Sequence, residues 1–333
     1  MPKLNKKIII IGLFFFLIIF VILIIFISPK STNTKTGTDA INRVSTTPTP
    51  SIYPEPDQNY LDEISYDNLE NNVLPETTPS YEIAPFILTQ SNSEKIAQTL
   101  GFPETEFNNN DVNPFLSGEN KTHHLTISPK SSQIYISNLS EKYISTQIGQ
   151  FSKSPDMLAV QIQSIISKLK IFDSKLVFAI SDVNYFQIAG YNLAPSSESE
   201  SNVLVIHMNP TIDGKFIYLQ NNSFVEAIFD SSDKMIKLAI NYPLAKISTQ
   251  PSRNIISYDS LLSLSPSKFF TLLYNPQNLA EVYSPPEITG IDPNQLSIGY
   301  FYKTPSNILE PIIVLESSDG LSTLYRFATP ASQ

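Results

Sequence analysis

The sequence predicts an α+β fold: an N-terminal transmembrane helix, followed by helices packed on antiparallel β-meander sheets. Three observations lead to this prediction. Residues 8–27 are twenty consecutive apolar residues without a charge. Residues 154–172 carry apolar side chains at helical spacing. Residues 202–241 divide into short strand-like runs separated by turn residues.

The apolar run at residues 8–27 is expected to be an uncleaved signal anchor. At about 1.5 Å rise per residue, such a helix is about 30 Å long, which matches the hydrocarbon core of a bilayer. A cleaved signal peptide is the alternative, but it would have a shorter apolar region and a small-x-small cleavage site, whereas Ser28-Pro29-Lys30 follows here. Three lysines precede the run. Residues 1–7 should therefore be a cytoplasmic tail, and the chain from Ser28 onward should be extracytoplasmic.

Composition excludes several classes of function. The formal net charge is -9, which disfavours binding to nucleic acid or to anionic lipid. The absence of cysteine excludes a thiolate nucleophile, a disulfide and a cysteine-ligated metal site. The ten glycines are widely spaced along the chain, so no glycine-rich loop could cradle a phosphate.

The first parts of the ectodomain are expected to be a tether and a small folded unit. Residues 28–80 are rich in proline, threonine and serine and are predicted to be a disordered tether. A first α+β unit then spans residues 81–150. It should contain a helix capped by Ser93, with Ile96, Ala97 and Leu100 inward, and a hairpin that turns at residues 129–132.

The second α+β unit is predicted at residues 151–250. Ser154 is expected to cap a helix. The buried stripe of this helix should be Leu158, Ile162, Ile165, Leu169 and Phe172. Strands should follow at residues 175–181, 184–191, 202–208, 215–220, 223–230 and 234–241. Short turns between the last four favour an antiparallel meander.

The third α+β unit is predicted at residues 251–333. It should begin with a helix around residues 258–274. Strands are expected at residues 296–303, 310–317 and 322–329, and a tight turn precedes the last of them.

This arrangement resembles the PepSY-like extracytoplasmic domains of the YycH/YycI regulatory membrane proteins. The residues that carry the resemblance are "EKIAQTLGF" (94–102), the hairpin at 123–137, the meander at 209–247 and the late strands at 296–320. The match covers roughly residues 90–330; the lack of tryptophan and the long proline-rich segment depart from the pattern. The resemblance implies PepSY-like repeats and regulation by contact with another membrane or envelope protein. It carries over no catalytic residue.

The three histidines, His123, His124 and His207, are predicted to be surface or hydrogen-bonded structural residues. His123 and His124 are neighbours in a strand and should face opposite sides, so they should not share a metal ion. The carboxylate pairs Asp230/Asp233 and Glu198/Glu200 lie in serine-rich turns, where solvated surface is expected.

Three short motifs suggest specific chemistries without completing them. The run at 108–120 lacks the turn glycine and the final glutamate of a calcium loop. "SPSK" (265–268) and "KTG" (35–37) stand in the wrong order for a serine acylase. "LPETT" (74–78) lacks the glycine and following span of a wall-sorting signal, and is expected to be part of the tether.

We therefore expect no catalytic residue, no cofactor-binding residue and no metal ligand, and hence a protein that is not an enzyme. The favoured function is a non-enzymatic regulatory or protein-interaction module at the cell envelope, with another membrane or envelope protein as its partner. The alternative is a module that binds a wall peptide or glycan and is displayed on a stalk. A wall hydrolase is the third hypothesis, which the missing constellations disfavour.

Overall fold

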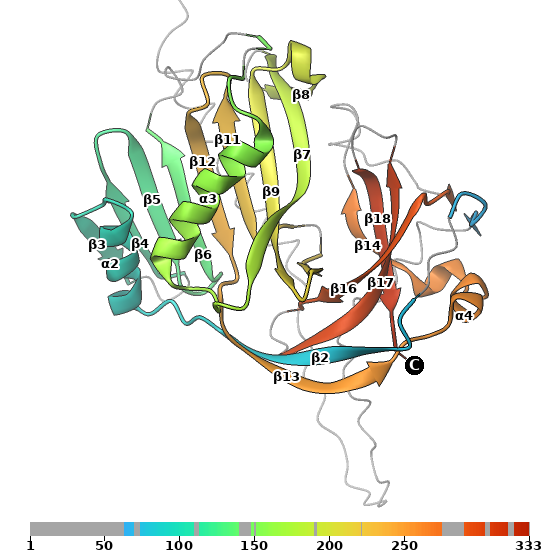
Figure 1. Ribbon diagram of the computed structural model, residues 1–333. Helices are drawn as coiled ribbons and strands as arrows, with labels where there is room; N and C mark the ends of the chain where they lie inside the picture. Colours follow the sequence, from blue (N-terminus) through green and yellow to red (C-terminus); the bar gives the residue numbers. More distant parts are fainter. Residues whose placement is uncertain are drawn as a thin grey trace, which may run out of the picture. The chain divides into compact units, whose positions relative to one another are not determined.

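Strands dominate the described part of the chain in this computed structural model (Figure 1). The structure describes residues 63–69, 74–109, 113–139, 148–149, 151–189, 192–220, 222–274, 290–303, 307–318 and 323–332. These residues all belong to one compact unit, Pro50–Gln333. The predicted cytoplasmic tail and transmembrane helix lie outside the described residues. Within the described residues, no helix has both the length and the apolar character that a membrane crossing requires.

Three α-helices occur in the described residues: α2 (Gln90–Thr99), α3 (Pro155–Leu169) and α4 (Tyr258–Leu262). Short 3₁₀ turns lie at η2 (Glu198–Glu200) and η3 (Pro266–Lys268). Ser154 caps α3 as predicted, because its side chain accepts a hydrogen bond from the Met157 amide. The cap of α2 is Thr89 rather than Ser93, so this helix begins earlier than predicted.

The strands of the first half of the described chain are β1 (Glu63–Ile64), β2 (Thr77–Pro85), β3 (Thr105–Asn108), β4 (Phe115–Glu119), β5 (His123–Ser128), β6 (Gln133–Asn138), β7 (Val177–Ala189), β8 (Asn192–Pro195) and β9 (Val203–Ile212). Those of the second half are β10 (Lys215–Tyr218), β11 (Val225–Asp230), β12 (Met235–Asn241), β13 (Leu244–Asn254), β14 (Phe270–Tyr274), β15 (Gly290–Ile291), β16 (Gln295–Phe301), β17 (Ile308–Ser318) and β18 (Thr323–Pro330).

The α+β prediction is wrong, because sixteen of these strands join one large mixed sheet instead of three small units. Its main path runs β13-β2-β17-β16-β10-β9-β11-β12-β6-β5-β4-β3, with β7, β8, β14 and β18 attached beside it. The hairpin of the predicted first unit pairs through β6 with β12 of the second. The described fold is therefore mainly β, and it does not consist of helix-and-meander repeats.

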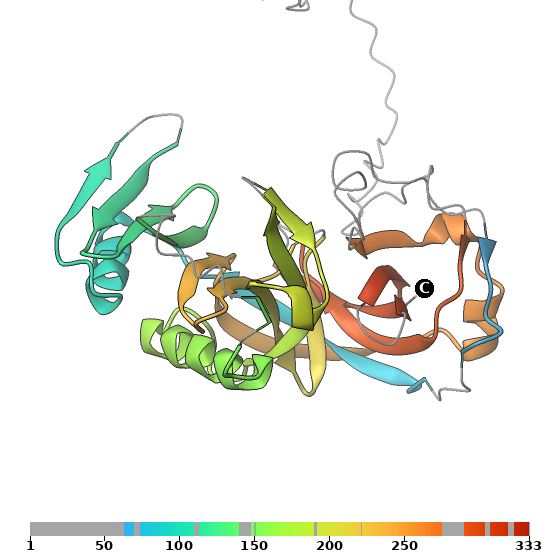
Figure 2. The ribbon, with the colours of Figure 1, turned by 90° about the horizontal axis from the view of Figure 1, so that it is seen from above.

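A long strand pair that the sequence analysis missed, β2 with β13, lies at one end of this sheet. Strand β2 pairs with β13 and also with β17, and Figures 1 and 2 show β2 and β13 running side by side. Residue 80, the predicted end of the tether, falls inside β2. Leu69 is buried in a core, and Thr78 and Ser80 are buried as well. The folded part thus begins earlier than Tyr81.

The central strands differ from the predicted meander at β10. The turn between β9 and β10 is confirmed, with Asp213 and Gly214 both at positive φ. Strand β9 pairs with both β10 and β11, so β10 does not contact β11 in sequence order. Instead, Ile217 and Tyr218 pair in parallel with Tyr300 and Phe301 of β16. This parallel strand pairing connects the central strands to the C-terminal ones.

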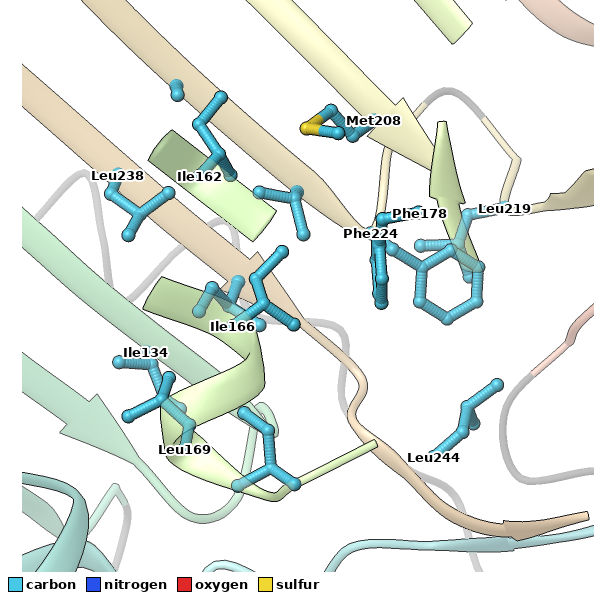
Figure 3. Close-up of a cluster of buried hydrophobic side chains, with 14 of the residues drawn as sticks. Ile134, Ile162, Ile166, Leu169, Phe178, Met208, Leu219, Phe224, Leu238 and Leu244 are labelled. Carbon is cyan, nitrogen blue, oxygen red and sulfur yellow. The ribbon is translucent and has the colours of Figure 1, made fainter. Parts of the chain in front are cut away.

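One face of the central strands carries the main core. Helices α2 and α3 lie on this face (Figures 1 and 2). Leu158, Ile162 and Leu169 of α3 are buried as predicted, whereas Ile165 is only partly buried. Figure 3 shows side chains from α3 and the neighbouring strands meeting in this core, including Ile166, Leu238 and Met208.

The C-terminal strands have cores of their own. Phe270 and Leu272 of β14 pack with Phe301 and with Tyr218, which enters this core from β10. The helix predicted at residues 258–274 is wrong over most of its length, since α4 ends at Leu262 and residues 270–274 form β14. Pro266 lies between the two, where its missing N–H and fixed φ oppose a continuous helix.

Candidate functional site

Three titratable side chains lie on the face of the central sheet opposite the helices. They are Asp182 on β7, His207 on β9 and Glu226 on β11. Strand register places Asp182 on one side of His207 and Glu226 on the other. Because successive side chains in a strand face opposite sides, all three point away from the core under α3.

These side chains line a cleft of about 210 Å³. The central strands and the turn before β11 supply most of its polar residues, and β10, β14 and β18 supply the remaining wall. The lining residues are Ser181, Asp182, His207, Asn209, Tyr218, Leu219, Asn222, Ser223, Glu226, Leu272, Leu273 and Arg326. The cleft therefore lies where the central strands meet the C-terminal ones.

His207 is held neutral near pH 7. Its Nδ1 lies 3.1 Å from Ser223 Oγ and 4.0 Å from Glu226 Oε2. Burial lowers the pKa of His207 from its ordinary value, and this effect exceeds the opposing attraction of Glu226 and Asp182. Glu226 Oε1 in turn binds Lys237 Nζ at 2.6 Å, and Lys237 also lowers the pKa of His207.

Arg326 forms the opposite wall of the cleft, and its positive charge is paired with the carboxylate of Glu316. Its Nε lies 2.7 Å from Glu316 Oε2 and its Nη2 lies at the same distance from that oxygen. Nη2 also donates to the Ser181 carbonyl at 3.2 Å, which ties β18 to β7. The guanidinium lies 5.5 Å from the ring centre of Tyr218. Burial raises the pKa of Tyr218 to about 12, so its hydroxyl stays protonated.

The Ser223, His207 and Glu226 arrangement does not have the geometry of a hydrolytic triad. In a triad, the nucleophile and the acid bind different ring nitrogens, so that the acid orients the base. Here Ser223 and Glu226 both approach Nδ1. Across the described residues, no group of three or more histidine, cysteine or acidic side chains is placed to hold a metal ion.

The other two histidines are placed apart from the cleft. His123 Nδ1 lies 2.7 Å from Thr122 Oγ1, and its Nε2 lies 3.4 Å from the Met235 carbonyl. His124 pairs with Glu119 at 3.4 Å. Both therefore have protein partners of their own, as the sequence analysis predicted for structural histidines.

The carboxylate pairs have different roles from each other. Asp230 is buried and its carboxylate accepts hydrogen bonds from the amides of Ser232 and Lys234 within its turn. The Asp233 carboxylate accepts hydrogen bonds from the backbone amide and the side-chain hydroxyl of Ser152. Glu198 and Glu200 lie on the exposed turn η2. The structure brings neither pair into the cleft.

The short motifs are likewise dispersed. Residues 265–268 form the exposed turn η3, whereas residues 35–37 lie outside the described residues. The calcium-like run at 108–120 is described only in part, and residues 115–119 of it form β4. Residues 74–78, predicted to be tether, lead into β2, and Leu74 packs against a C-terminal core.

Sequence reasoning missed this cleft, although a signal for it was present. His207 and Glu226 each stand between two apolar residues in a strand, and Asp182 follows Ser181 in β7. A single polar residue at an outward position of one strand is ordinary surface. Only the pairing of β7, β9 and β11 places the three side by side.

Comparison with known proteins shows that the chain is similar to a solved structure. No family model matches the chain, and no curated protein matches it significantly. The chain is similar to an uncharacterized protein from Eubacterium rectale ATCC 33656, known from a crystal structure, with 12% sequence identity and a TM-score of 0.44. That similarity covers 82% of this chain and 88% of the other.

Proposed function

We propose that the protein is a single-pass membrane protein whose extracytoplasmic domain binds a partner at the cell envelope without catalysing a reaction. The anchor at residues 8–27, with lysines before it, supports this location. The cleft beside His207 is the observation that carries the binding role. It combines polar side chains on rigid strands with an apolar wall, as ligand-binding pockets commonly do.

The absence of a hydrolytic arrangement in the cleft supports binding over catalysis. His207 lies at its centre, and its neighbours Ser223 and Glu226 both approach the same nitrogen. A base that orients a nucleophile needs its second nitrogen held by another group. The contacts of Arg326 with Glu316 and Ser181 brace the wall of the cleft.

Two kinds of partner fit this function. The resemblance to YycH/YycI domains favours another membrane or envelope protein, which this domain would regulate by contact. The polar cleft favours the alternative, a wall peptide or glycan small enough to enter about 210 Å³.

One experiment tests the binding role and separates the two partners. The full chain is crosslinked in native membranes and purified, and in parallel it is sedimented with protein-free wall material. Enrichment of one envelope protein supports regulation by contact, whereas co-sedimentation supports the wall ligand. Turnover of wall material by the purified chain would contradict the proposal, as would a chain that engages neither.

A further inference from the structure

Two nearly buried side chains in the cleft have polar atoms that the protein leaves unused. Asn209 is 3% exposed, and its Oδ1 accepts a hydrogen bond from the Phe224 amide at 3.1 Å. Its Nδ2 donates to no residue that the structure describes. Tyr218 is 6% exposed, and its hydroxyl likewise makes no hydrogen bond to the described residues.

His207 supplies a third unused atom. Its Nδ1 faces Ser223 and Glu226, whereas its Nε2 binds no described residue. The nearby carboxylate of Glu226 favours a proton on Nδ1, which leaves Nε2 as an acceptor. All three side chains line the same cleft.

Polar atoms in proteins are nearly always paired, with the protein, with water or with a ligand, so these atoms are available to whatever occupies the cleft. An unpaired donor in a closed core destabilises the fold, but a donor on a cleft wall can be paired by whatever enters. Asn209 lies on strand β9 and Tyr218 on strand β10, so both are held in position by the sheet before a ligand arrives.

The required hydrogen bonds define the ligand. Asn209 Nδ2 and the protonated Tyr218 hydroxyl need an acceptor, whereas His207 Nε2 and the carboxylates of Asp182 and Glu226 are acceptors that suit a donor. An ammonium group only donates, so it would leave Asn209 unpaired. A carboxylate or phosphate only accepts, and it would also be repelled by Asp182 and Glu226.

Hydroxyl groups both donate and accept, and they carry no charge. Leu272 and Leu273 add an apolar wall to the cleft, against which the C–H surface of a ring can pack. We propose that the cleft binds one ring of a neutral, hydroxyl-bearing sugar through Asn209, Tyr218 and His207. This inference rests on the proposed binding function and names the class of its ligand.

The test uses the full chain in a zwitterionic detergent, because detergents with sugar head groups would compete. Neutral hexose and N-acetylhexosamine tetrasaccharides, a diamine and a sugar acid are offered at up to about 10 mM, a range that detects weak affinity. Binding is followed by saturation-transfer NMR and calorimetry. We expect a neutral tetrasaccharide to bind and the diamine and sugar acid not to bind.

Two variants remove single hydrogen bonds from the cleft. Tyr218→Phe deletes only the hydroxyl and should weaken binding about three- to tenfold. Asn209→Asp keeps the acceptor for the Phe224 amide but removes the donor, and should weaken binding at least as much. Tyr135→Phe is the matched control, since Tyr135 is 38% exposed and does not line the cleft.

Each outcome decides a different point. Binding that survives both cleft variants, or no binding of any neutral sugar, overturns the sugar site. Preference for the diamine or the sugar acid overturns the ligand class but leaves a binding protein. Enrichment of an envelope protein without sugar binding also leaves the proposed function intact, whereas turnover of the tetrasaccharide overturns that function itself.

The sugar could belong to the wall or to a glycosylated partner. If the chain co-sediments with protein-free wall material, and Tyr218→Phe reduces the amount that co-sediments, the wall is the source of the sugar. Loss of crosslinking after enzymatic deglycosylation of membrane proteins identifies a glycoprotein instead. Either source fits the proposed chemistry, and sugar-independent results in both arms contradict it.

Discussion

At the scale of single residues, His207 shows how a strand face can tune a titratable group. The imidazole shares its nitrogen Nδ1 between Ser223 and Glu226, and Lys237 neutralises the far oxygen of that carboxylate. Burial then outweighs the nearby acids and lowers the pKa of His207. The protein consequently keeps a neutral histidine in the cleft at a pH where an exposed one begins to charge.

This lowered pKa predicts a pH-dependent stability. Below an ordinary histidine pKa of 6.5, the unfolded chain binds a proton at residue 207 before the folded chain does. The free energy of unfolding should therefore fall as pH decreases from about 6.5 toward the lowered pKa. His207→Gln should flatten that slope in urea melts between about pH 5 and 8.

A second buried group acts in the opposite sense and provides a control. Burial raises the pKa of Glu310 above its ordinary 4.5, despite its ion pair with Arg253 at 2.8 Å. The folded state then holds that proton more tightly than the unfolded state does. The contribution of Glu310 to the free energy of unfolding should therefore decrease as pH rises through 4.5 toward the raised pKa. Glu310→Gln should remove that loss and leave the His207 slope unchanged. An identical slope in His207→Gln and the unaltered protein would refute the assignment to His207.

Burial along β12 predicts unequal effects for two similar side chains. Leu238 is 1% exposed, and Leu238→Ala should lower the free energy of unfolding by about 2–5 kcal/mol. Ile236 lies at a bulge opposite β11 and is only half-buried, so Ile236→Ala should cost less. Urea denaturation of both variants measures the difference, and equal losses would mean that the two sites are equally packed.

At the scale of elements, the sequence correctly predicted those helices and strand pairs whose stabilising interactions are close together in the sequence. Helix α3 carries its own cap and stripe, and the hairpin of β5 and β6 carries its own turn, so both were predicted correctly. Strands β2 and β13 were missed because each is paired by a segment more than 150 residues away. The cleft was missed for a related reason, since its opposite wall comes from β18, where Arg326 contacts Ser181 of β7 across 145 positions of the sequence.

Glycine at position 299 is required by the parallel pairing of β10 with β16. A Cβ placed there would lie 2.6 Å from Tyr218 Cε2 and 3.1 Å from the Phe216 carbonyl. Gly299→Ala should therefore lower stability by about 1–3 kcal/mol through overpacking. Adding Tyr218→Ala should make the alanine at 299 less costly, because the nearest ring atoms are gone.

A double-mutant cycle measures that coupling directly. Thermal or urea unfolding of the two single variants and the double variant gives the interaction energy. A coupling near zero would show that the Phe216 backbone, rather than the Tyr218 ring, determines the cost at position 299.

The N-terminal boundary of the fold gives a second prediction for elements. Residues 77–80 belong to β2, and Leu69 and Leu74 pack in a C-terminal core. A chain cut to Tyr81–Gln333 should therefore unfold at a lower temperature than Pro50–Gln333, since it loses half of β2 and these contacts. Calorimetry of both fragments checks this. Equal melting temperatures would restore residue 80 as the boundary.

At the scale of the whole molecule, the proposed anchor and the binding cleft belong to different parts of the chain, residues 8–27 and the folded strands. The segment between the proposed anchor and the folded strands is rich in proline and threonine. The full chain has a formal net charge of -9, so contact with anionic lipid would be electrostatically unfavourable. Under the proposed topology, we expect its ligand in the envelope beyond the membrane surface.

The last prediction concerns this topology. Residues 8–27 should remain in the mature protein, with the chain from Ser28 onward outside, because a twenty-residue apolar run behind three lysines favours a retained, positive-inside span. Protease added to intact spheroplasts should digest the domain and leave a small membrane-bound fragment. Moving the positive charge, by Lys3→Glu, Lys6→Glu and Lys7→Glu together with two lysines after residue 30, should protect the domain in part of the molecules. A protected domain in the unaltered protein would overturn the orientation, and a secreted form that begins near residue 30 would overturn the anchor.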